Sequence, residues 1–256
     1  MKHNIKHVIL WSGTIAVALL LFGFASTKHT NARCWKMDIE VEHLSGLYFI
    51  DKASIQERIL NLGDPILGTK LDSIRIDHIR HTLVQLPSVN TAEVYTTVDG
   101  ILKVTVTQRT PLFRVINRKG DSFYVDTEGG RMPLSQHYTA RVPVLIGNIN
   151  TTFAEQANSD AENTILEEAY RLFQFIETDP LWSAQTEHIV VDKNYEFELI
   201  PRVGNARILI GKPVELEEKF KRLKAFYLEM AHNNNINKYK RINVKYRDQV
   251  VCERYY

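Results

Sequence analysis

The chain opens with an apolar stretch whose placement constrains every later inference about the fold. Residues 8–26 contain no charged side chain, and Lys2 and Lys6 lie ahead of them. Because a helix rises about 1.5 Å per residue, a stretch of this length just spans a hydrocarbon core of about 30 Å. We therefore predict one transmembrane helix at residues 8–26, preceded by a short tail at 1–7 and followed by a polar connector at 27–37.

Two other interpretations of this stretch are open. A cleaved secretory signal has a basic start, an apolar region of about 7–15 residues and a small-x-small cleavage site. Residues 23–25, Gly-Phe-Ala, would supply such a site, but the apolar stretch is longer than that of a signal and stays bulky through Phe22. The third interpretation is a buried core helix. The uncleaved anchor fits the length and the bulky end best.

The charges that flank the stretch do not fix its orientation. On one side stand Lys2 and Lys6. On the other side stand Lys28, Arg33 and Lys36. The positive-inside rule therefore gives little bias, and long domains translocate largely regardless of charge. From charge alone, the topology with the large part in the cytoplasm stays open.

Composition limits the kinds of partner that the chain can bind. Its 256 residues are 44% hydrophobic, with a net charge of +2, which suits one or two packed domains. A broad nucleic-acid surface would need clustered Lys and Arg. The longest basic cluster, at 238–241, is short and interrupted by a tyrosine. We interpret it as a solvated strand start and predict no nucleic-acid partner.

The sequence offers no catalytic or metal-binding constellation. It has no Gly-rich phosphate loop, no GxSxG and no HExxH. His78 and His81 share a helix face, which is more typical of solvated side chains than of metal ligands. The acidic run at 160–168 coincides with a helix start, where the dipole favours acids, and we expect Trp182 to anchor a loop. We predict no enzyme activity, no cofactor, no metal and no small-molecule substrate.

Two cysteines, Cys34 and Cys252, lie far apart in the chain. No CxxC or Cys/His spacing suggests zinc. In an oxidising compartment they could pair, but sequence cannot settle connectivity. We take two unpaired thiols as the expectation.

Residues 38–109 have the pattern of a small α+β domain. A strand at 39–43 precedes two helices, which Asp51 and Asp72 can cap. Pro87 stops the second helix. A hairpin with a two-residue Asp99-Gly100 turn follows at 92–107. The order strand, helix, helix, strand, strand predicts a three-stranded sheet with both helices on one face.

Residues 110–256 predict a second, mixed domain that is rich in strands. We expect an edge or extended segment at 141–147, because Pro143 cannot donate to a ladder. A helix is predicted at 163–177, and a longer one ends near residue 232. The last strand is expected at 241–246, and Val250 and Val251 would continue it or return along it.

Five segments together carry the pattern of a known family. They lie at 49–52 (with Gly46 ahead of them), 86–89 (with Ala92 and Val94 after them), 102–111, 124–129 and 242–246. In this set the chain resembles the bacterial cell-division proteins FtsQ/DivIB, in which a short tail and a single span precede a POTRA domain and a β domain. The chain departs from the family pattern at three positions: Gln108 stands for Glu, Asn243 for Asp and Lys245 for Arg.

The resemblance implies where the protein works and with what. It implies residues 1–7 in the cytoplasm, one inner-membrane span, the bulk in the periplasm, and a place at the division septum. A POTRA domain would occupy 38–109 and an FtsQ-type β domain 110–256. The implied role is a non-enzymatic scaffold that links early and late divisome proteins and binds FtsB-like and FtsL-like single-pass proteins. Other divisome proteins would bind the POTRA domain, at its exposed strand near residues 94–98.

The resemblance and the strand pattern together define a candidate site. A terminal strand at a sheet edge offers unpaired backbone groups to which a partner strand can add. Tyr246 matches the family's tyrosine at that edge, with a core tyrosine as the other interpretation. Lys245 and Arg247 would supply charge to an acidic partner, although Lys in place of Arg weakens the case for bidentate carboxylate binding. The predicted partner-binding residues are Ile242, Val244, Lys245, Tyr246, Arg247, Val250 and Val251.

Two other classes of function are open. The POTRA pattern also occurs in envelope-assembly or translocation modules, where it would bind extended client peptides. Broad peptide binding without septal localisation would favour that class. The third class, a membrane-anchored hydrolase, would need a catalytic cluster assembled from distant residues.

Overall fold

The computed structural model describes two compact units, Met1–Gln108 and Arg109–Tyr256. The residues that it describes are 15, 17, 32–42, 46–136, 138–153, 160–233 and 236–255. The predicted transmembrane helix at 8–26 lies outside them, apart from Ile15 and Val17. Among the described residues, no helix combines the length and the apolar character needed to cross a membrane.

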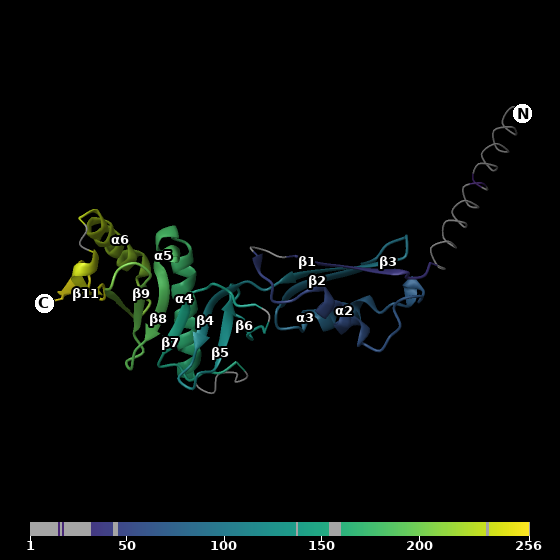
Figure 1. The fold of residues 1–256 in the computed structure, drawn as a ribbon, viewed down its shortest axis with the longest axis horizontal. Helices are drawn as coiled ribbons and strands as arrows, with labels where there is room; N and C mark the ends of the chain where they lie inside the picture. The colour runs from purple at the N-terminus through teal and green to yellow at the C-terminus, as the bar shows by residue number, and fades with distance from the viewer. Residues whose placement is uncertain are drawn as a thin grey trace, which may run out of the picture. The chain divides into compact units, whose positions relative to one another are not determined.

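The first unit is an α+β sandwich of one sheet and one helical layer. Its elements are β1 (Lys36–Glu42), α2 (Lys52–Leu60), α3 (Ile76–Val84), β2 (Val89–Thr96) and β3 (Ile101–Gln108). The strand order is β1-β3-β2, with β1 parallel and β2 antiparallel to the central β3. Both helices lie against the same face of the sheet (Figure 1). The predicted order strand, helix, helix, strand, strand is confirmed.

The core of this unit follows from two periodicities. Along β3, alternate residues point inward, and Leu102, Val104 and Val106 are buried. On α2, Ile55 and Ile59 stand one helical turn apart and are fully buried against these strand residues. β1 and β2 are the outer strands, and among the described residues no further strand pairs with either of them.

Of the two helix caps predicted in this unit, one is confirmed and one is wrong. Asp51 caps α2, because its carboxylate accepts the N–H of Ser54 at 2.8 Å. The predicted cap of the second helix is wrong: Asp72 lies in the separate 3-10 helix η2 (Leu71–Ser73), and α3 begins after Arg75, which makes no side-chain capping bond. An extended residue, Ile74, separates the two helices.

The hairpin turn also differs from the prediction. Its four residues are 97–100, with the Gly100 N–H bonded to the Thr97 carbonyl, instead of a two-residue Asp99-Gly100 turn. Only Gly100 adopts a positive φ, of 82°. A glycine is required there for a second reason, since a Cβ at position 100 would lie 2.5 Å from the Arg33 carbonyl oxygen.

The second unit is built on a nine-stranded mixed sheet with the order β12-β11-β10-β9-β8-β7-β4-β5-β6. The strands are β4 (Pro111–Ile116), β5 (Ser122–Asp126), β6 (Arg131–Met132), β7 (Val144–Gly147), β8 (Thr186–Val191), β9 (Phe197–Pro201), β10 (Arg207–Gly211), β11 (Tyr239–Asn243) and β12 (Val251–Arg254). Residues 141–147 were expected to form an edge or extended segment; the edge is wrong, and the extended conformation is found in β7. There β7 pairs with both β4 and β8, and Pro143 precedes the ladder.

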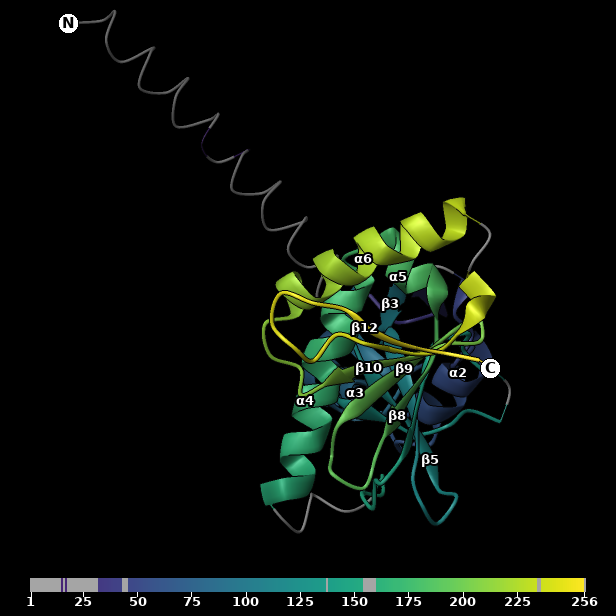
Figure 2. The same cartoon turned by 90° about the vertical axis from the view of Figure 1, so that its left-hand side faces the viewer.

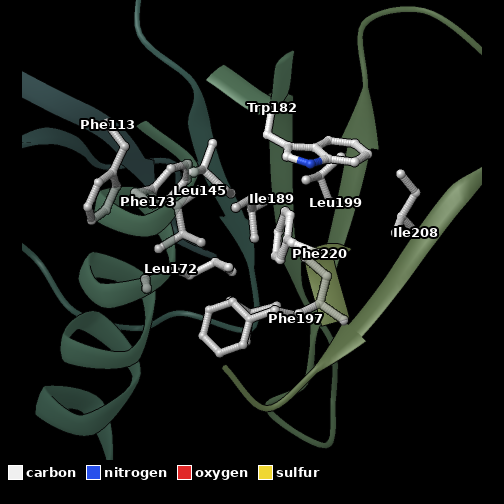
Figure 3. Close-up of a cluster of buried hydrophobic side chains, with 14 of the residues drawn as sticks. Phe113, Leu145, Leu172, Phe173, Trp182, Ile189, Phe197, Leu199, Ile208 and Phe220 are labelled. Atoms are coloured by element: carbon white, nitrogen blue, oxygen red, sulfur yellow. The ribbon is translucent and has the colours of Figure 1, made fainter. Parts of the chain in front are cut away.

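Three helices cover one face of this sheet (Figure 2). They are α4 (Asp160–Glu177), α5 (Pro180–Gln185) and α6 (Leu216–His232), and a short 3-10 helix, η3 (Ile236–Lys238), leads into β11. Their apolar faces form one core with the inward residues of the strands (Figure 3). Phe173 of α4 stacks on Phe113 of β4 with ring centroids 4.3 Å apart.

The expectation that Trp182 anchors a loop is wrong, because this residue is part of the core. It lies on α5, is fully buried, and contacts the Phe220 ring of α6 edge-on at 5.5 Å. Its burial ties α5 to α6, which in turn supports the C-terminal strands.

Candidate protein interface at the C-terminal sheet edge

The predicted edge strand, β11, lies inside the sheet, and the last strand, β12, lies at its edge. β11 pairs in parallel with β10 on one side and antiparallel with β12 on the other, so that Ile242 lies between Ile208 and Cys252. The expectation that the strand at 241–246 is itself the open edge is therefore wrong. Residues 251–254 return along it as β12, and β12 is the terminal strand of the sheet.

The seven predicted residues divide into three groups. Ile242 and Val244 are core residues, with 2% and 0% of their surface exposed. Val250 is partly buried and packs against the same core. The remaining four are exposed: Lys245, Tyr246, Arg247 and Val251. Only these four present their side chains to a partner in the folded protein.

The turn after β11 directs three of these side chains outward. The strand ends at Asn243, whose side-chain oxygen accepts the Lys245 N–H at 3.0 Å and so redirects the chain. Arg222 of α6 donates to the carbonyl oxygens of Val244 and Tyr246, at 3.4 and 3.2 Å. The turn is thus held from the helix side, although its side chains are exposed.

Tyr246 is 51% exposed, so the interpretation of it as a core tyrosine is wrong. Val251 and Tyr255, on alternating positions of the edge segment, are 44% and 52% exposed. The sequence analysis did not single out Tyr255. The feature of the sequence that indicates Tyr255 is the alternation of positions 251, 253 and 255, which places these side chains on one face of a strand.

The backbone of β12 has a defined open side. The Tyr255 N–H donates at 3.2 Å to the carbonyl of Lys238, the residue just before β11, so Tyr255 directs its backbone groups to the β11 side. In an antiparallel pair, alternate residues direct both backbone groups to the same neighbour. Cys252 and Arg254 therefore direct their N–H and C=O groups away from β11, to the side where no other described strand pairs with β12.

The two predicted cationic contacts are already paired within the chain. The Lys245 ammonium lies 2.6 Å from the Glu196 carboxylate, and its stem crosses Gly211, where a Cβ would lie 2.8 Å from Lys245 Cγ. Arg247 lies 2.9 Å from Glu215, and this hydrogen bond lowers the pKa of the Glu215 carboxyl. The Arg247 pair is highly exposed, and such pairs contribute little stability. Arg247 can therefore exchange Glu215 for a partner carboxylate more readily than Lys245 can leave Glu196.

A buried lysine of α6, which the sequence analysis missed, binds the backbone at the end of β10. Lys219 of α6 is 5% exposed, and its ammonium donates to the carbonyl oxygens of Ile210 and Lys212, at 3.0 and 2.7 Å. Burial lowers the pKa of Lys219. The signal in the sequence was a lysine on the apolar face of a helix, three residues after Leu216.

The other candidate residues do not assemble into a reactive site. His78 and His81 are both exposed on α3. Within the described residues, no three His, Cys, Asp or Glu side chains are grouped so as to hold a metal ion. Cys34 is buried in the first unit, Cys252 lies on β12, and both are free thiols.

These features define a two-unit protein, in which a small α+β domain is followed by a sheet domain whose last described strand is β12. Comparison with protein families matches a POTRA-like domain over residues 32–107. The family described as FtsQ/DivIB, C-terminal related, matches residues 110–253, more than half of the chain. The chain belongs to the FtsQ/DivIB family, whose members are non-enzymatic cell-division proteins. A comparison with curated proteins found no match.

Proposed function

We propose that this protein is a divisome scaffold, which links early and late cell-division proteins at the septum by protein–protein binding without turnover. The observation that carries the proposal is the open edge of β12, bordered by the exposed side chains of Tyr246, Val251 and Tyr255. An open edge strand supplies backbone hydrogen bonds, and aromatic neighbours supply the anchors that dominate interface energetics.

The partners that we propose are FtsB-like and FtsL-like single-pass division proteins, bound by strand addition at β12. The partner strand would pair with the open backbone groups of Cys252 and Arg254. Tyr246 and Val251 would give it apolar contacts, and Arg247 would bind an acidic side chain. Ile242, Val244 and Val250 would act indirectly, since they hold β11 and the turn against the core.

The proposed location is the inner membrane, with residues 1–7 in the cytoplasm, a single span at 8–26, and both units in the periplasm. A second contact region is proposed in the POTRA unit. There β2 ends the three-stranded sheet, and Tyr95, near its end, is half exposed. Further divisome proteins would bind this edge. Use of the same edge for extended client peptides is the alternative function, and the family match over 110–253 favours the division role.

The test removes one backbone donor from the open side of β12. In Arg254→Pro, the lost N–H is not one that pairs with β11, and proline is tolerated at such edge positions. Loss of a hydrogen bond and the clash with a partner strand should weaken partner binding by about tenfold or more. Arg254→Ala is the matched control, since it removes the same side chain and keeps the donor.

The measurement is co-purification of full-length protein with its partners from membranes, followed by titration of the partner's soluble segment. Tyr246→Ala, which keeps the backbone intact, should weaken binding by about 2 kcal/mol if Tyr246 is an anchor. Equal binding by Arg254→Pro and Arg254→Ala would reject strand addition at β12. If no single-pass division protein co-purifies with the unaltered chain, the scaffold function itself is rejected.

A further inference from the structure

Three segments that are distant in sequence meet where β1 begins. The Cys34 N–H donates to the Thr69 carbonyl at 2.9 Å, and the Trp35 N–H donates to the Gly100 carbonyl at 3.0 Å. These bonds join residues 32–36, the loop 66–70 and the turn 97–100. We call this surface the N-terminal tip, because the first continuous described segment of this unit starts there, at Ala32.

The N-terminal tip exposes large apolar side chains in a fixed arrangement. Trp35, Leu67 and Val98 are 64%, 56% and 72% exposed. The Trp35 indole N–H donates to the Asp99 carbonyl at 2.6 Å, so its one polar group is already satisfied. The absence of a side chain at Gly100 makes room for the ring, since a Cβ there would lie 2.9 Å from Trp35 Cδ1. The exposed part of the indole is therefore apolar, and covering it leaves no donor unpaired.

Cations border these apolar side chains. Arg33, Lys36 and Lys70 are all exposed. The first two lie in the segment 32–36 of the tip, and Lys70 lies in its loop 66–70. The turn contributes one carboxylate, Asp99. Farther from the tip, the outward-facing positions of β1 are acidic: Asp38, Glu40 and Glu42. Along β1, the positive charge therefore lies at the same end as the exposed apolar side chains.

The chain itself indicates what covers the tip. The predicted transmembrane helix ends at residue 26, and the tip begins at residue 32. A chain spans at most about 3.3–3.6 Å per residue, so the tip lies within about 20 Å of the end of that helix. A surface held this close to the end of the helix can reach the phospholipid headgroups.

We propose that the N-terminal tip is a membrane-docking surface that inserts Trp35, Leu67 and Val98 between anionic phospholipid headgroups. Tryptophan is enriched at membrane–water interfaces, where one part of the ring is apolar and its surroundings are wet. Exposed lysine and arginine side chains are attracted to anionic lipids. Docking would fix the height and rotation of the first unit over the membrane. It rests on the predicted helix at 8–26 and is independent of partner binding at β12.

The test places a spin label on the tip of the full-length protein. The chain would carry Cys252→Ser, so that buried Cys34 is the sole native thiol, together with Val98→Cys for labelling. Glu93→Cys, exposed on β2 away from the tip, gives the matched control label. Both proteins would be reconstituted in nanodiscs of phosphatidylcholine with an equal part of phosphatidylglycerol. Collision rates with oxygen and with a water-soluble nickel chelate report the depth of each label.

The expected result is a label at position 98 that is accessible to oxygen and shielded from nickel, with the label at position 93 open to nickel. Lys36→Glu with Lys70→Glu should abolish the shielding, because each cation near an anionic surface adds roughly fivefold to its partitioning. Lys193→Glu with Lys221→Glu makes the same change in net charge within the second unit and should leave the shielding unchanged. These four substitutions are at exposed positions, so the fold should be retained.

Two outcomes would overturn the proposal. One is equal nickel accessibility of the labels at positions 98 and 93 in the anionic nanodiscs. The other is shielding of position 98 in native membranes but not in lipid-only nanodiscs, which would assign the tip to a protein partner. Neither outcome bears on the scaffold function, which the Arg254→Pro comparison tests separately.

Discussion

At the scale of single residues, two basic side chains of α6 organise the candidate interface without reaching it. Lys219 and Arg222 donate to backbone carbonyl oxygens at the ends of β10 and β11. A lysine with so little exposure is tolerated because carbonyl oxygens accept its hydrogen bonds, and burial still lowers its pKa. The position of the exposed turn thus depends on donors that lie beneath it.

We expect Lys219→Met to destabilise the second unit by about 2 kcal/mol, because the apolar stem is kept while the Ile210 and Lys212 carbonyls lose their donor. Lys221→Met, on the exposed side of the same helix, should change the free energy of unfolding by less than about 0.5 kcal/mol. Urea unfolding of both variants measures the difference. Equal stabilities would mean that water replaces the ammonium.

At the scale of elements, the short helix α5 is joined to α6 by one carboxylate. Asp179 caps α5 through the Leu181 N–H, at 2.9 Å, and binds the Lys224 ammonium of α6, at 2.6 Å. The Lys224 hydrogen bond is the main cause that lowers the pKa of Asp179 below its usual value. Because α6 also carries Lys219 and Arg222, this link connects α5 to the helix that holds the C-terminal turn.

A depressed carboxyl pKa predicts the direction of a pH effect. Since the folded pKa of Asp179 is below the unfolded one, its ionised form stabilises the fold above the unfolded pKa, and this contribution is lost as the pH falls through the folded pKa. Asp179→Asn keeps an acceptor for the cap and loses the charge. We expect it to cost at most about 1 kcal/mol at pH 7 and less at pH 3, where thermal unfolding should show the two proteins converging. A constant difference between these pH values would assign the effect to the cap alone.

At the scale of the whole molecule, each unit has its own hydrophobic core, and the chain passes from one to the other between Gln108 and Arg109. These neighbouring side chains serve different units. Gln108 accepts the N–H groups of Phe49 and Ile50 within the first unit, at 2.9 and 3.1 Å. Arg109 pairs with the buried carboxylate of Asp126 in the second, at 3.1 Å.

Separate cores predict separate unfolding transitions. Leu83 and Leu172 are both fully buried, the first on α3 and the second on α4. Leu83→Ala and Leu172→Ala should each destabilise one unit by about 2–5 kcal/mol. Calorimetry of the full-length protein should show that each variant moves a different transition. A single transition, shifted by both substitutions, would mean that the units unfold as one.

The sequence by itself determined the local features of this protein. The alternation of Leu102, Val104 and Val106, the cap at Asp51 and the spacing of the helical core residues all follow from neighbours within a few positions. They sufficed for the α+β class, the element order of the first unit and the resemblance that the family comparison bears out. Where a local signal had a local competitor, as at Asp72, the prediction failed.

Only the tertiary structure decided which strand is open and which charges are committed. A period of two in the sequence assigns the faces of a strand, but it does not say whether another strand lies beside it. The sequence therefore does not show that Ile242 lies on an internal strand, which follows from the pairing of β11 with β12. In the same way, the pairing of Lys245 with Glu196 joins a residue that follows β11 to one that precedes β9. Strand neighbours and ion pairs of this kind are contacts between distant segments, and they are set by packing and loop closure, which no local pattern records.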